Sequence, residues 1–91
     1  MKMSRKDKIM YEAMYKAKID TSDEVEFDIG DGRTIMLPPE ITSDEGLRKA
    51  QKEYQKLNRK YGWREGNVIK RMTGLLIRID EYKEKRDRGT L

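Results

Sequence analysis

Basic side chains concentrated in one part of the chain are the residues best suited to chemistry. Residues 48–71 contain nine lysines and arginines against only two glutamates. Several of the basic residues recur at the spacing of one helix face, and a tryptophan lies among them. The candidate ligand-binding residues are Lys56, Arg59, Lys60, Trp63, Arg64, Lys70 and Arg71.

This combination of residue types suits a ligand that carries phosphate. An arginine can hold a phosphate through two parallel hydrogen bonds, and a lysine adds a point charge. The ring of Trp63 can stack on a base, and a helix that starts soon after Arg64 would offer free backbone N–H groups to an anion. We therefore expect a nucleotide or a nucleic acid as the partner. The alternative is a solvated helix face on which Trp63 serves only for packing.

An acidic segment precedes the basic one. Residues 20–32 hold six carboxylates and no lysine or arginine. Their spacing matches no EF-hand calcium loop. Glu24, Glu26 and Asp28 alternate with apolar residues, which is typical of the solvent face of a strand. We expect no metal site here, and part of the basic surface could instead pair with these acids.

Composition argues against several chemistries. The chain has no cysteine and no histidine, so it lacks disulfides, thiolate metal ligands and the commonest general base. Ser4, Ser22 and Ser43 fall where caps or turns are expected, and no histidine can activate them. We expect a protein that is not an enzyme and uses no cofactor.

The length of 91 residues predicts a single domain over 1–91, with frayed ends at 1–3 and 86–91. The charged N-terminus is not followed by an apolar run, as a signal peptide would be. The longest apolar stretch, around 72–77, is too short to span a bilayer. These features favour a cytoplasmic protein with no membrane partner.

Strict alternation of apolar and polar residues over 24–29, followed by a Gly-Asp-Gly turn and the apolar residues 35–37, predicts a β-hairpin. A two-residue loop would pair Phe27 with Met36. A three-residue loop would pair Phe27 with Ile35, gather more apolar bulk on one face and put Gly32 at a left-handed position. We favour the three-residue loop and expect Phe27 in the core.

Three segments have helical periodicity. Residues 5–18 repeat apolar side chains three and four positions apart. A second helix follows a capping box at 42–45, runs to Tyr61 and is ended by Gly62. A third, with Asn67 as candidate N-cap, has the same apolar seam, so a short connector predicts an antiparallel helical hairpin. The seams contain Leu47, Ala50, Tyr54, Leu57 and Tyr61 in one helix and Val68, Met72, Leu75, Ile79 and Tyr82 in the other.

The expected fold class is α+β in the order α-β-β-α-α, with an N-terminal helix, a β-hairpin and a C-terminal antiparallel helical hairpin. A two-stranded hairpin is unstable alone, and so small a domain buries a limited core. Because the third helix is apolar beyond its seam, we expect a homo-oligomer. Gly74 in that helix costs about 1 kcal/mol relative to alanine, which a close approach of another helix would explain.

The leading functional hypothesis is a non-enzymatic anion-binding module whose ligand is a nucleotide or nucleic acid. The size and composition are typical of small accessory proteins of bacteria and their phages, where such a module could sequester a nucleotide signal or block a nucleic-acid enzyme. The rival is a protein–protein adaptor or inhibitor that uses the apolar helical stripe. A helix-turn-helix DNA-binding protein ranks third, since the seams suit near-antiparallel packing.

Overall fold

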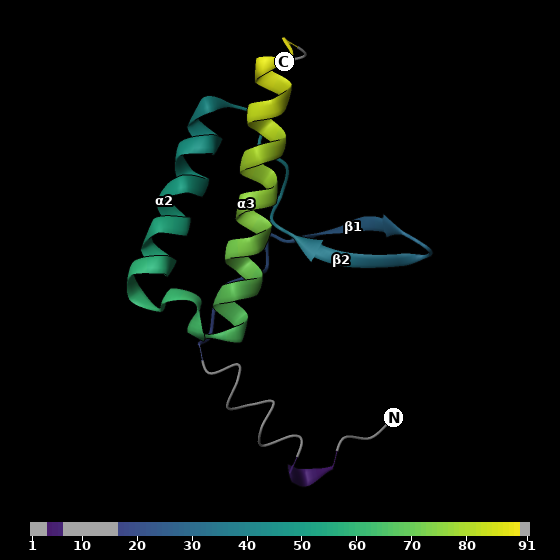
Figure 1. The fold of residues 1–91 in the computed structure, drawn as a ribbon, viewed down its shortest axis with the longest axis vertical. Coiled ribbons are helices and arrows are strands. Elements are labelled where there is room, and N and C mark those ends of the chain that lie inside the picture. Colours follow the sequence, from purple (N-terminus) through teal and green to yellow (C-terminus); the bar gives the residue numbers. More distant parts are fainter. Residues whose placement is uncertain (1–3, 7–16, 90–91) are drawn as a thin grey trace.

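The structure, a computed structural model, describes residues 4–6 and 17–89 (Figure 1). Two antiparallel helices lie side by side, and a β-hairpin projects from the far side of the second helix. The elements are β1 (Val25–Gly30), β2 (Arg33–Leu37), α2 (Asp44–Lys60), the 3₁₀ turn η1 (Gly62–Arg64) and α3 (Gly66–Asp87).

The described elements follow the order β-β-α-α, so the expected order α-β-β-α-α is wrong. Of the N-terminal helix expected over 5–18, residues 7–16 lie outside the described residues, and its last two residues are not helical. The physical reason at that end is a tertiary contact. The Ala17 carbonyl accepts a 2.6 Å hydrogen bond from the Asn67 side chain. Ala17 is buried and Ile19 packs on the core, so the helical pair holds this segment in a non-helical path.

The two chain ends differ in what can be described. Residues 1–3 and 90–91, part of the ends expected to fray, lie outside the described residues. The C-terminal helix α3 is helical as far as Asp87, and Gly89 then takes a φ of 72°, a common way to end a helix. Within the described ranges, no helix is long and apolar enough to cross a membrane.

The core lies between α2 and α3. Three of the five seam residues of α2 are buried, and its two seam tyrosines pack at the core's margin. All five seam residues of α3 are buried, Val68 and Met72 completely. The predicted antiparallel helical hairpin is therefore confirmed. Beyond the seam, Ile69 and Leu76 are half-buried and Ile77 is exposed, so part of the wide apolar stripe remains uncovered.

Local signals set the ends of the helices. The N-cap Ser43 accepts a 3.1 Å hydrogen bond at Oγ from the Gly46 N–H. The cap therefore lies one residue after the start of the expected capping box at 42–45, and a glycine stands where that box would have its glutamate. Gly62 follows α2 with a φ of 66°, a left-handed conformation that glycine adopts without strain, so the helix ends there. The expectation that Asn67 caps α3 is wrong. Glu65 occupies that N-cap position, and Asn67 lies inside the helix with its amide bonded elsewhere.

The β-hairpin has the predicted register, with Phe27 opposite Ile35. Its loop is nevertheless shorter than the predicted three residues, because Gly30 pairs with Arg33 and a bulge between Asp28 and Gly30 takes up the extra residue. The glycine before Arg33 has the predicted positive φ, 73°. Phe27 is only half-buried, so the expectation that it belongs to the core is wrong.

The hairpin joins the helical pair through one close contact at its base. Leu37 is buried, and Pro38 lies directly against Gly74 of α3, where an added Cβ would be 2.6 Å from the proline Cδ. The close approach expected at Gly74 is therefore made by the end of β2 and not by another helix. Arg78, one turn along α3, donates a 2.7 Å hydrogen bond to the Pro38 carbonyl. The rest of the hairpin projects away from α3 (Figure 1).

Candidate nucleic-acid interface

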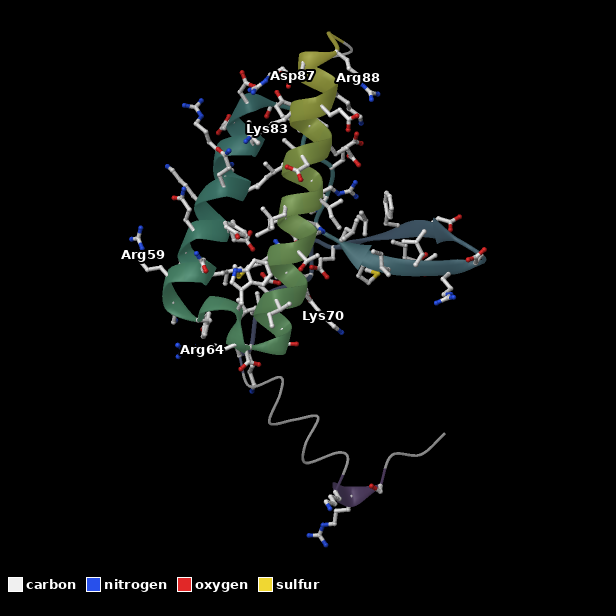
Figure 2. The ribbon with its side chains drawn as sticks, in the orientation of Figure 1. Arg59, Arg64, Lys70, Lys83, Asp87 and Arg88 are labelled. Carbon is white, nitrogen blue, oxygen red and sulfur yellow. The ribbon has the colours of Figure 1, made fainter. Side chains whose placement is uncertain are left out.

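The seven candidate ligand-binding residues do not share one surface (Figure 2). Arg71 is buried, and Lys70 lies on the side of α3 towards the hairpin. Arg59 and Arg64 project on the opposite side, away from the hairpin. The five candidates that share the end of α2 and the turn after it are Lys56, Arg59, Lys60, Trp63 and Arg64.

The outer surface at this end of α2 presents a dense array of cations. We call it the basic face and define it as Lys52, Lys56, Arg59, Lys60 and Arg64. All five side chains are exposed, and none of them forms an ion pair with another described residue. The four on α2 line a shallow hollow of ≈ 340 Å³. The distance from Lys52 to Lys60 along the helix axis is about 12 Å.

The cations near the end of α3 are placed differently. Arg78, Arg86 and Arg88 each form an ion pair with a carboxylate, at 3.3, 3.7 and 2.5 Å respectively. Lys85 pairs with Glu40 at 2.5 Å, which raises the pKa of the lysine through that hydrogen bond. The basic face therefore differs from this part of α3, where these three arginines and Lys85 have carboxylate partners.

Trp63 lies at the end of the basic face. It is 47% exposed, and of the described aromatic residues it is the only exposed one. Its ring packs edge-on against Tyr54 of α2, with centroids 6.3 Å apart and planes inclined at 63°. The neighbouring Tyr61 is half-buried, with the Lys60 ammonium 5.2 Å from its ring centre. The protein thus fixes the indole by one contact and leaves much of it open to solvent.

Arg71 is committed to contacts within the chain. Its guanidinium makes five hydrogen bonds, matching its five N–H donors, to carboxylates of Glu53, Asp23 and Glu24. The hydrogen bond that Arg71 donates to Glu53, followed by those to Asp23 and Glu24, raises the pKa of Arg71 above its ordinary value, against the opposing effect of burial. The side chain joins α2, α3 and the segment before β1. We call this cluster the Arg71 clamp.

Lys70 belongs to a different surface. With Lys18 it lines a groove of ≈ 840 Å³ between β2 and the N-terminal half of α3. Ile35 and Met36 of β2 and Ile77 of α3 are among the residues that line it. Lys70 is therefore separated from the basic face by the thickness of α3 (Figure 2).

The start of α3 carries a carboxylate of its own. Glu65 is the N-cap residue, and its side chain makes no hydrogen bond to the backbone N–H groups of the helix. One of the carboxylate oxygens, Oε1, is buried and has no hydrogen-bond partner among the described residues. A negative charge already at this helix terminus opposes a second one, so the basic face depends on its side chains alone.

The acidic segment divides into two parts. Asp23 and Glu24 reach the buried guanidinium, so part of the basic segment does pair with the chain's own acids. Glu26, Asp28 and Asp31 are exposed on the hairpin, which projects away from α2 (Figure 1). No group of three or more potential metal ligands in the described part of the chain is arranged to hold an ion.

Sequence reasoning missed two features of these surfaces. Lys52 belongs to the basic face. It is part of the same basic stripe in the sequence, four residues before Lys56, but was not included among the candidate ligand-binding residues. Pairing between the basic and acidic segments was expected, but no signal singled out Arg71, because Asp23 and Glu24 lie 48 and 47 positions before it in the sequence. Comparison of the chain with protein-family models, with curated proteins and with solved structures found no match, so the function has to be argued from these surfaces.

Proposed function

We propose that the protein is a non-enzymatic binding module that holds the phosphate backbone of a nucleic acid on the basic face. The observation that carries the proposal is the group of five exposed cations without ion pairs among the described residues, gathered at the end of α2 and in η1, while several cations of α3 have carboxylate partners. Such a surface attracts polyanions and gains free energy when their counterions are released.

The shape of the basic face favours a polymer over a single nucleotide. A mononucleotide is best held in an enclosed pocket, whereas the hollow on the basic face is shallow and follows the helix axis. A row of phosphates can contact successive cations along such a surface. Sequestration of a free nucleotide signal is therefore the weaker form of the proposal, and blocking of a nucleic-acid enzyme by occupying its substrate is the stronger one.

The helix-turn-helix alternative fits this geometry less well. In that motif, the second helix of a steeply crossed pair enters the major groove. Here α2 and α3 lie side by side, and the cations of the basic face belong to the first helix and the turn after it (Figures 1 and 2). Lys70 and Arg71 on the second helix face the groove and the buried clamp instead.

A salt series with matched charge reversals tests the proposal. Binding of a labelled oligonucleotide should weaken as salt rises, and Arg59→Glu should lower the affinity and reduce the slope of log Kd against log salt. Lys83→Glu makes the same change in net charge on the exposed surface of α3 (Figure 2). Lys83 lies about 25 Å along the helix axis from the start of α3, which is more than the screening length of about 10 Å. Lys83→Glu should therefore leave binding nearly unchanged. Absence of binding at low salt, or equal losses in both variants, would refute the proposal.

A second candidate is a protein interface on the groove between β2 and α3. The observation that favours it is exposed apolar surface: Ile35 is 39% exposed, Met36 53% and Ile77 37%. A second copy of the chain is the partner that fits the expected homo-oligomer, because a two-stranded hairpin gains stability when its apolar side is covered. Light scattering over a dilution series tests this candidate, and Met36→Lys should shift the mass towards the monomer. A monomer mass at every concentration rules out self-association.

A further inference from the structure

We propose that Trp63 stacks on an unpaired base, so that the ligand of the basic face is a single-stranded nucleic acid. This inference rests on the proposed function, because it assumes that the phosphates of the same strand contact the cations around Trp63. It goes further by naming the class of nucleic acid and the residue that selects it.

The first support is the exposure of Trp63. Large aromatic side chains gain free energy when buried, so an isolated domain usually covers them. Trp63 is 47% exposed, whereas Tyr54 and Tyr61 beside it are half-buried. A flat aromatic surface left open among cations is the arrangement by which single-strand-binding proteins combine base stacking with backbone contacts.

The second support is the way the backbone presents the ring. Gly62 takes a φ of 66°, which ends α2, and Trp63 is the next residue, in the 3₁₀ turn that follows the helix. The edge-on contact with Tyr54 then holds the indole at 6.3 Å between ring centres. The ring is therefore fixed before a ligand arrives, which lowers the entropy lost on binding.

The third support is the position of the cations around the ring. Arg59 and Lys60 precede Trp63 by four and three residues, and Arg64 follows it directly. A strand whose base lies on the indole could therefore place phosphates near cations on both sides of that base. A duplex cannot use this site in the same way, because its bases are already stacked and paired, and opening a step costs free energy.

Three oligonucleotides of the same length, about 12 nucleotides, separate backbone binding from stacking. They are oligothymidine, an abasic strand with the same phosphates, and a duplex. Oligothymidine should bind most tightly and quench the fluorescence of Trp63, the only tryptophan in the chain. The abasic strand should bind more weakly without that quenching. Uridine and 2′-deoxyuridine strands, which differ only in the sugar, identify the preferred sugar when added to the set.

Substitution at Trp63 provides the second measurement. Trp63→Leu should raise the Kd for oligothymidine about 5- to 150-fold, which corresponds to about 1 to 3 kcal/mol for one stacked base. The Kd for the abasic strand and the salt slope should stay unchanged, because no phosphate contact is lost. Trp63→Phe keeps an aromatic face and should retain most of the affinity. Circular dichroism of both variants checks that the helical pair is intact.

The possible outcomes distinguish the two proposals. Equal affinity for oligothymidine and the abasic strand, or for the duplex, overturns stacking by Trp63 and leaves the phosphate-binding function standing. Loss of affinity for the abasic strand in Trp63→Leu also overturns it, since the residue would then act through the structure of the basic face. If none of the strands binds at low salt, both proposals are wrong.

Discussion

Replacing Gly74 by alanine sets two opposing effects against each other. Alanine favours a helix interior by about 1 kcal/mol over glycine, so the change would stabilise an isolated α3. In the folded protein, however, the new Cβ would lie 2.6 Å from Pro38 Cδ, 3.3 Å from its Cγ and 3.4 Å from Leu37 Cδ2. Carbon atoms pack best at about 3.5 to 4.0 Å, so the proline ring has to move by about 1 Å.

The structure indicates that this movement is costly. Pro38 is a rigid, buried ring, and its carbonyl accepts the 2.7 Å hydrogen bond from Arg78. Inserting a methyl group into packed surroundings costs about 1 to 3 kcal/mol, and a ring that cannot rotate away belongs in the upper half of that range. After the gain in helix propensity, Gly74→Ala should lower the free energy of unfolding by about 1 to 2 kcal/mol. For a domain of this size, each 1 kcal/mol lowers the Tm by about 4 to 8 °C.

Gly46 provides a matched control in the other helix. Its added Cβ would meet Ser43 Oγ at 3.4 Å and Ile41 Cγ2 at 3.5 Å, both ordinary contacts. Gly46→Ala should therefore stabilise the protein by up to about 1 kcal/mol. Urea denaturation followed by circular dichroism measures both variants. Adding Pro38→Ala should relieve the Gly74→Ala cost, which a double-mutant cycle reports as a coupling energy.

The result that contradicts this reasoning is clear. If Gly74→Ala is as stable as the parent, or more stable, the close approach of Pro38 does not constrain α3. If the cost persists unchanged in the Pro38→Ala background, it arises elsewhere in the structure.

Three further predictions concern the contacts that join the elements. Arg71→Met should lower the free energy of unfolding by about 2 to 4 kcal/mol. This is less than the cost of breaking a fully buried pair, because Asp23 and Glu53 are partly exposed. Arg71→Lys should have an intermediate effect, and urea titration measures both variants. Phe27→Ala should cost about 1 to 2 kcal/mol rather than the 3 to 5 of a fully buried ring, and a larger loss would show that the hairpin packs more tightly. The hydrogen bond to Asp44 and burial raise the pKa of Tyr82 above its ordinary value of 10.0. The stability that this hydrogen bond contributes is therefore complete below pH 10 and is lost as the pH rises through the pKa of the folded protein. Tyr82→Phe should lower the Tm at pH 7 and make the Tm less dependent on alkaline pH.

The helical pair was predictable because its signals are local or periodic. Ser43 caps α2 from three residues away, Gly62 ends the helix by its own backbone conformation, and the seam residues repeat every three to four positions. The hairpin register followed for the same reason, since alternation decides which side chains share a face. The bulge was missed because it leaves the pairing of Phe27 with Ile35 unchanged. A three-residue loop without a bulge and a two-residue loop with one unpaired residue in β1 both place these two residues opposite each other.

The contacts that place the elements relative to one another were not predictable. Asn67 has the sequence signal of an N-cap, yet its amide is used 50 residues away, at the Ala17 carbonyl. The same carbonyl contact keeps Lys18 out of the expected N-terminal helix. Arg71 and Lys70 are neighbours in sequence and equally basic, but helix rotation buries one and exposes the other. Consecutive positions in a helix point about 100° apart, and the sequence alone did not specify which of the two would face the acids.

The separation of charge across α3 gives the described part of the chain an electric dipole. Its positive pole is the basic face, and its negative pole is the exposed part of the hairpin, where Glu26, Asp28 and Asp31 outnumber the one basic residue, Arg33. In the field of a polyanion, such a molecule would rotate before contact, so that the hairpin trails and the productive orientation is reached more often per encounter. Copies bound along one strand would hold their acidic hairpins outward, where mutual repulsion would space them and limit how densely the strand is coated.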